Sequence, residues 1–228
     1  MKKPTAEGFR RLIVSAAGLL ALLLGFGILG LSFGSAGEGM AGLQAVVKTL
    51  IGSAPSDDML GTIIWRIRLP RVLTAALVGA ALSLGGLIFQ ALLRNPLAEP
   101  YILGISGGSA IGAIIGILAG LGRFTGVSVT AFAGSIGTLG LLLVLSSGRT
   151  MLKKDALLLA GVMVNAFCSA VIMFLVSLTQ DARLHNILFW MMGDLSMVGL
   201  PQVFTLAAIA LPCFGILFLC AGKLNLLL

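Results

Sequence analysis

The chain has 228 residues, a mean hydropathy of +1.12, 58% hydrophobic residues and only 10% charged residues. These values are typical of an integral membrane protein and exclude an ordinary soluble domain. The net charge is +7, but the basic residues lie between apolar runs and form no basic face, so we expect no nucleic-acid partner. A single histidine, His185, and three cysteines without metal-ligand spacing predict that the chain has no metal site.

Six apolar segments are each near the roughly 20 residues that a helix needs to cross the hydrocarbon of a bilayer. They cover residues 12–33, 72–93, 102–121, 127–146, 156–178 and 201–220. The first segment is too long for a signal peptide and lacks a convincing cleavage site. We therefore predict an all-α fold, a polytopic transmembrane helix bundle that forms one domain over residues 1–228.

The distribution of basic residues gives a weak indication of orientation. If both termini are cytoplasmic, nine Lys and Arg residues lie inside and six lie outside. This asymmetry agrees with the positive-inside rule, and it places segment 34–69 outside the membrane. We expect a multi-pass protein of a bacterial inner membrane, surrounded by lipid, with both termini in the cytoplasm.

The stretch "RIRLPR" precedes the second apolar segment. Because the residue before a proline avoids helical angles, we predict that the helix begins at Pro70. Arg71 would then lie in the first turn, where the helix dipole disfavours a cation. Arg68 and Arg71 also lie on the predicted outer side, against the charge rule. The positions of these arginines thus conflict with both the helix-dipole preference and the positive-inside rule, and such a conflict indicates a functional site. Anchoring to lipid headgroups is the alternative.

The stretch "RNPLAEP" joins the second and third apolar segments. Arg94 ends one helix and Glu99 precedes the next, so each charge suits the neighbouring helix dipole. Asn95 and the proline after it favour a turn, and Pro100 suits a first helical position. These local effects predict a rigid reversal of the chain. They do not explain Leu97, an apolar residue at the tip of a cytoplasmic turn.

Small and amide residues mark positions inside the predicted helices. In the third apolar segment glycine recurs at every fourth position, namely at Gly104, Gly108, Gly112, Gly116 and Gly120. Such a stripe allows close packing of helices in lipid. Gln90 and Asn165 are interior amides, which either bond a neighbouring helix or line a transport path.

Over residues 66 to 228, the sequence resembles one family of permeases. The stretch "RLPRVLTAALVGAALSLGGLIFQALLRNPLAEPYILGISGGSAIGA", with "LLLAGVMVNAFCSAVIMFL" and "WMMGDLS" further on, is similar to the FecCD family of ABC importers for ferric siderophores, haem and cobalamin. The resemblance implies a permease that works as a homodimer with a cytoplasmic ABC ATPase and an extracytoplasmic substrate-binding protein. ATP and Mg would bind the ATPase, so we expect no cofactor in this chain.

The resemblance also implies roles for particular residues. The two arginines of the "RLPR" motif, Arg68 and Arg71, would receive acidic residues of the binding protein. Asn95 and Leu97 of the "NPLAEP" motif would form a cytoplasmic gate, and Ser146 and Ser147 match a second gate strand approximately. Members of the family have about ten spans, so we expect a chain truncated after six, without the helices that couple to the ATPase.

Two other functions are alternatives to a permease. The stretch "GISG" matches a pattern of intramembrane serine proteases, with His185 as the candidate base. A base must lie within hydrogen-bond reach of the serine, but Ser106 and His185 are predicted at opposite sides of the bilayer. We therefore expect no catalytic residue and no enzyme. A secondary transporter or channel is the other alternative, although the spans carry no mid-span charge for ion coupling.

Overall fold

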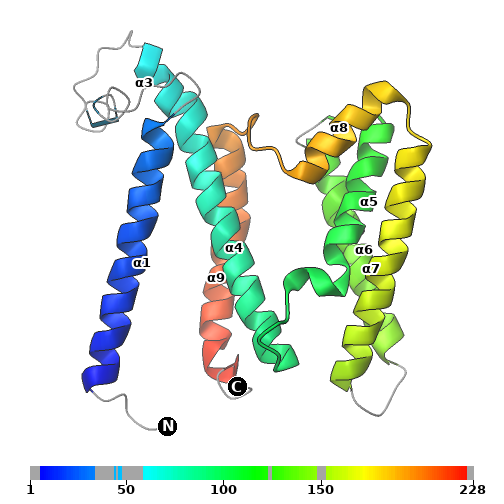
Figure 1. Ribbon diagram of the computed structural model, residues 1–228, viewed down its shortest axis with the longest axis horizontal. Helices are drawn as coiled ribbons and strands as arrows, with labels where there is room; N and C mark the ends of the chain where they lie inside the picture. Colours follow the sequence, from blue (N-terminus) through cyan, green and yellow to red (C-terminus); the bar gives the residue numbers. More distant parts are fainter. Residues whose placement is uncertain are drawn as a thin grey trace. The chain divides into compact units, whose positions relative to one another are not determined.

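The computed structural model describes residues 6–33, 44, 46–47, 59–122, 125–147 and 153–224. They belong to two compact units, residues 1–79 with 195–211 and residues 80–194 with 212–228. All regular elements among the described residues are helical (Figure 1). The predicted all-α polytopic bundle is confirmed, whereas the single domain over residues 1–228 stays a prediction.

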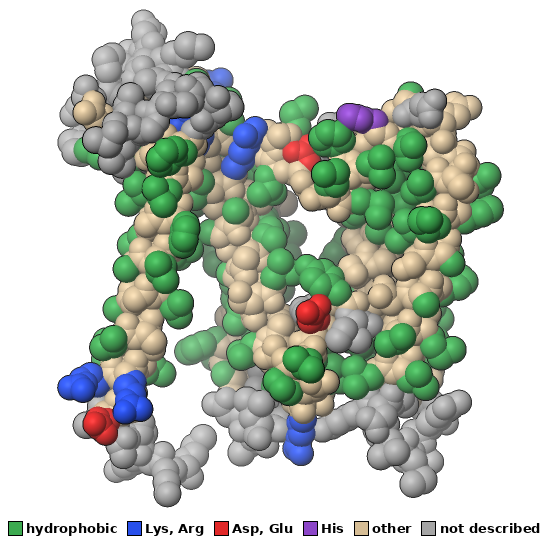
Figure 2. Space-filling model, viewed as in Figure 1, with side chains coloured by type: hydrophobic (Ala, Val, Ile, Leu, Met, Phe, Trp, Pro, Cys, Tyr) green, Lys and Arg blue, Asp and Glu red, His purple; other side chains and the backbone are tan. Residues whose placement is uncertain are grey.

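Within the part of the chain that the structure describes, five helices are long and apolar enough to cross a membrane. They cover Glu7–Ser32, Gly61–Leu93, Thr125–Ser146, Leu157–Ser177 and Leu200–Gly222. Apolar side chains cover these helices, and the visible Lys and Arg side chains lie toward helix ends (Figure 2). This distribution is expected where hydrocarbon surrounds the middle of each helix and water surrounds its ends.

The first unit contains α1 (Ala6–Ser32), α3 (Met59–Ile63), a π-helical turn (Ile64–Arg68), the beginning of α4 (Leu69–Leu93) and the first part of α9 (Leu200–Leu224). The C-terminal end of α1 lies against the beginning of α4, where a Cβ added at Gly30 would lie 3.1 Å from a Val72 methyl. A small cluster of Val46, Ile64 and Leu31 packs beside this contact. The remainder of α1 keeps its apolar side chains exposed.

The second unit contains the 3-10 turn Pro100–Leu103 and the helices α5 (Ile105–Leu118), α6 (Thr125–Ser147), α7 (Lys153–Ser177) and α8 (Asp181–Met192). α5 packs most extensively against α6 and also contacts α7 and α8. α8 lies across the C-terminal end of α5 (Figure 1), and the Arg183 side chain donates a hydrogen bond to the Leu118 carbonyl there. Trp190 packs on a cluster formed by Ala113, Val127 and Ala131.

The third predicted span differs from the expectation of one long helix over residues 102–121. α5 has only 14 residues, about 21 Å at 1.5 Å per residue, and the hydrocarbon core is about 30 Å thick. Glycines limit it at both ends, because Gly104 has φ +73° and Gly120 has φ +72°. A residue in this left-handed conformation cannot continue a right-handed helix.

Candidate functional site

The helix that carries the predicted outer arginines does not begin at Pro70, so that prediction is wrong. α3, the π-helical turn and α4 run on without a break, and Pro70 lies inside this run. A proline ring crowds the carbonyl four residues earlier and offers no N–H. The wider π turn makes room for it: the Leu69 N–H bonds the Ile64 carbonyl, five residues back. Arg71 is therefore not in a first turn, and the helix-dipole argument for it fails.

Arg68 is buried, with 9% of its surface exposed, and it closes the end of α1. Its Nη1 donates to the Leu31 carbonyl at 2.8 Å and to the Ser32 carbonyl at 3.2 Å. The last carbonyls of a helix lack partners within that helix, and they attract a cation. This contact stabilises α1 against α4. The sequence could not indicate it, because 36 positions separate Arg68 from Ser32.

Arg71 is half-buried and bonds a segment far along the chain. Its Nη2 donates to the Ser196 carbonyl at 2.7 Å, whereas its Nε is buried without a partner among the described residues. A buried donor without a partner costs about 1–3 kcal/mol. Arg71 therefore keeps one donor that no acceptor among the described residues satisfies.

The turn after α4 has a defined hydrogen-bond pattern. The Asn95 N–H bonds the Gln90 carbonyl at 3.2 Å, and Arg94 has φ +48°. This six-to-one bond around a left-handed residue is the Schellman motif that ends many helices, normally with glycine in the left-handed place. Asn95 Oδ1 then accepts the Leu97 N–H at 2.9 Å. The turn holds Leu97 with 81% of its surface exposed.

The segment after this turn is held against α7. Ala98 and Leu103 are buried, and the 3-10 turn begins at Pro100, as the sequence predicted. A Cβ added at Gly104 would lie 3.0 Å from a Val164 methyl and 3.2 Å from the Asn165 nitrogen. The exposed Leu97 is thus presented by a turn whose following residues are fixed in the second unit.

The other predicted site residues occupy less defined surroundings. Ser146 Oγ donates to the Leu143 carbonyl of its own helix at 3.1 Å, and the side chain of Ser147 lies outside the described residues. Gln90 is half-buried, and Asn165 is exposed on α7. Their placement does not separate lining of a path from bonding to a neighbouring helix, so both readings remain predictions.

Three of the five predicted packing glycines lie within α5 and face α6. A Cβ added at Gly108, Gly112 or Gly116 would meet α6 atoms, including the Gly134 carbonyl oxygen at 2.6 Å from Gly108 and the Thr130 carbonyl carbon at 2.8 Å from Gly112. Gly104 lies outside the helix but packs against α7. Gly120 also lies outside α5 and has no described atom within 4 Å, so the expected packing is not found there.

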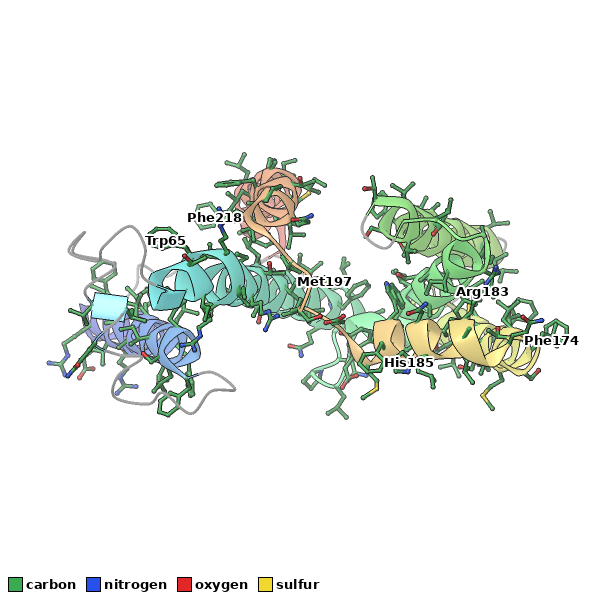
Figure 3. All side chains as sticks on the ribbon, turned by 90° about the horizontal axis from the view of Figure 1, so that it is seen from above. Trp65, Phe174, Arg183, His185, Met197 and Phe218 are labelled. Carbon is green, nitrogen blue, oxygen red and sulfur yellow. The ribbon has the colours of Figure 1, made fainter. Side chains whose placement is uncertain are left out.

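The candidate protease pair is far apart. Ser106 lies at the first turn of α5, whereas the α8 residue Arg183 bonds Leu118 at the last turn. These two turns are about 18 Å apart along the helix. His185 follows two residues after Arg183 on α8, with its ring 4.4 Å from that of Phe189, and Figure 3 labels both residues. Among the described residues, no group of His, Cys, Asp or Glu could hold a metal ion.

The helices long enough to span a bilayer define a multi-pass membrane protein. Its residues 20–228 match the FecCD transport family. Because this match covers most of the chain, the chain belongs to the FecCD transport family.

Individual relatives agree with this assignment. The chain is 43% identical over 155 residues to the uncharacterized ABC transporter permease protein YvrB of Bacillus subtilis, covering 65% of this chain and 43% of YvrB. It is 39% identical over 148 residues to the vitamin B12 import system permease protein BtuC of Salmonella paratyphi A, covering 64% of this chain and 45% of BtuC. The matched regions are less than half the length of each relative.

The fold is similar to that of an inward-facing transporter described as an ABC transporter of metal-chelate type. The TM-score is 0.76 at 30% sequence identity, and the similarity covers 92% of this chain and 63% of the solved chain.

Proposed function

We propose that the chain is a permease subunit of an ATP-driven importer, and that two copies form the path for a metal chelate. The substrate class is a ferric siderophore, haem or cobalamin, delivered by an external binding protein. The observation that carries the proposal is the family match over residues 20–228. Relatives described as a vitamin B12 permease and a metal-chelate transporter support the substrate class.

A separate ATPase supplies the energy in this proposal. ATP and Mg bind that partner, and this chain acts as a transport subunit without catalytic residues. A serine protease needs its base within hydrogen-bond reach of the serine. Ser106 lies at one end of α5, whereas α8, which carries the candidate base His185, bonds the other end, and this separation supports the view. The test is purification of the complex from cells that express this chain with its neighbouring genes. An ATPase that co-purifies supports the proposal, and its absence under conditions that retain the binding protein contradicts it.

The proposed orientation places both termini in the cytoplasm of a bacterium, with the protein in the inner membrane. The beginning of α4 then faces outward and the turn at Leu97 faces inward. A cysteine replacing Ser56 should react with an impermeant reagent added outside intact cells, whereas one replacing Thr150 should not. The opposite labelling pattern would reverse the assignment of both ends.

The exposed turn serves as the cytoplasmic gate in this proposal. Leu97 is an apolar side chain with 81% of its surface exposed, and Asn95 fixes the backbone that carries it. Close to a twofold axis, the same residue of each copy meets its mate, so one exposed leucine makes a paired apolar contact. We assign Ser146 and Ser147 to a second gate strand, and Gln90 and Asn165 to the wall of the path.

The pairing at Leu97 can be tested with one cysteine per chain, in a variant whose Cys168, Cys213 and Cys220 are replaced by alanine. In the complete complex, Leu97→Cys should form a disulfide-linked dimer under mild oxidation in at least one nucleotide state. Leu159→Cys, an exposed position on α7, is a control for random collision. Equal cross-linking of the two variants, or none at position 97 in any nucleotide state, would contradict a gate at the twofold axis.

Docking of the binding protein is assigned to Arg68 and Arg71 by similarity to the family. Arg71 Nε has no partner among the described residues, but it is buried, so the side chain must move before an acidic group can bond this atom. Arg68 already bonds two carbonyls of α1, so an acidic partner must share or replace these bonds. Docking through Arg68 would therefore be coupled to the end of α1.

A further inference from the structure

A third arginine at the beginning of α4 differs from the two in the motif. Arg66 lies in the π-helical turn, and its side chain is exposed, whereas Arg68 is buried. Arg68 and Arg71 both bond backbone carbonyls. Arg66 has no hydrogen bond or ion pair within the described part of the chain. No described residue therefore has to give up a contact when a partner binds this charge.

The neighbours of Arg66 are large and apolar, and they are also exposed. Trp65 has 46% of its surface exposed and Ile67 has 42%. Figure 3 shows Trp65 on the side of this helix that faces away from α1. Tryptophan and arginine are the residues most often found to dominate the binding energy of protein interfaces. Their combination indicates an interface that is covered in the working complex.

The length of the helix distinguishes a protein partner from a lipid headgroup. From Arg94 to Arg71 the helix rises about 35 Å, which already spans a hydrocarbon core of about 30 Å. Arg66 lies five residues beyond Arg71, or roughly 7 Å further along the helix. The headgroup layer on each side is about 5–7 Å thick, so Arg66 reaches its outer limit. A partner in the water outside fits this position better than a lipid phosphate.

We propose that Arg66, with Trp65 and Ile67, is a docking contact for an acidic patch on the external binding protein. The inference rests on the proposed function and orientation, which supply this partner. It adds a contact outside the "RLPR" motif. Because Arg66 is exposed and bonds no described residue, it contributes to docking while Arg68 continues to hold the end of α1.

The test measures the affinity of the binding protein encoded beside this chain for the complete complex in phosphatidylcholine nanodiscs. Arg66→Glu should weaken binding at least about tenfold, because like charges then face each other. Arg66→Ala should weaken binding a few-fold, and the affinity of this variant should depend less on salt concentration. Arg10→Glu, an exposed arginine at the other end of the first unit's α1, is the matched control and should bind as the wild type does.

The possible outcomes separate this inference from the proposed function. If the wild-type complex binds and Arg66→Glu binds equally well, the docking role of Arg66 is wrong and the proposed function stands. If the wild-type complex does not bind the protein at all, both are wrong. A binding-protein variant with an acidic residue changed to arginine that restores the affinity of Arg66→Glu would identify the partner residue. Thermal stability of the complex is also compared in phosphatidylcholine and phosphatidylglycerol nanodiscs. If Arg66→Glu changes only the difference in stability between these two lipids and leaves binding unchanged, Arg66 is a lipid anchor and the inference fails.

Discussion

Glycine is frequent in both α1 and α5, yet the two helices are held in different ways. In α5, Gly108 and Gly112 allow the backbone of α6 to approach directly. In α1, Gly18 and Gly25 have no described atom within 4 Å, and the helix is held near its C-terminal end. The difference is in the partner: α6 presents Gly134 and threonines, so two small surfaces meet. A run of small residues therefore predicts the capacity for close packing, and the opposing helix decides whether it occurs.

The largest effect should come from filling the α5–α6 contact. In Gly112→Leu the new side chain would meet backbone atoms of α6, 2.8 Å from the Thr130 carbonyl carbon and 3.1 Å from the Ala131 Cα. A backbone cannot move aside as a side chain can, so we expect a loss of about 3 kcal/mol or more. Thermal unfolding in detergent, followed by size-exclusion fluorescence, measures this change.

Gly25→Leu in α1 is the matched control, because the same side chain enters open space there. It should change stability by less than about 1 kcal/mol. If both substitutions destabilise equally, the two helices do not differ in the way described.

The next effect concerns the arginine that closes the end of α1. Arg68→Ala removes donors from two carbonyls, and a hydrogen bond to a charged group is worth about 1.5–3 kcal/mol. We expect a loss of that order, with partial recovery in Arg68→Lys, measured by thermal unfolding. Arg10→Ala, exposed at the opposite end of α1, should have little effect. Stability unchanged in Arg68→Ala would show that this contact does not hold α1.

The smallest expected effect is a gain in stability. Arg94 has φ +48°, a conformation that costs a non-glycine residue about 1–2 kcal/mol. Arg94→Gly removes this cost but increases the freedom of the unfolded chain, so we expect a net gain of about 0.5–1 kcal/mol. Arg94→Ala loses the charge and keeps the strain, and it should show no gain. A destabilised Arg94→Gly would indicate that the arginine side chain holds the turn.

The helices could be predicted because apolar length alone indicates a membrane span. The third span was predicted too long, since its Gly104 and Gly120 are also compatible with a helix in lipid and nothing in the letters shows their positive φ. The sequence also does not show that Pro70 lies inside a helix. Proline is over-represented at the first position of a helix, and the π turn that accommodates Pro70 inside a helix has no clear sequence signal.

In the candidate sites, too, features set by local sequence can be predicted, whereas contacts between distant segments cannot. The turn at Asn95 and Pro100 follows from local preferences, which the sequence contains in full. The partner of Arg68 is a carbonyl from a different helix, and such a contact depends on packing between distant segments. The sequence does not distinguish Arg66 from Arg68, because the difference in their exposure is a property of the folded chain.

The most direct test of the central claim is uptake of substrate by the complete complex in proteoliposomes. With the partner ATPase and the binding protein present, labelled cobalamin, a ferric siderophore and haemin are offered in turn, with ATP enclosed on the ATPase side. We expect the proteoliposomes to accumulate at least one of these substrates. This accumulation should require ATP, and it should be lost when the ATPase is inactivated by a substitution in its own active site. Uptake that continues equally without ATP, or after that substitution, would contradict an ATP-driven importer.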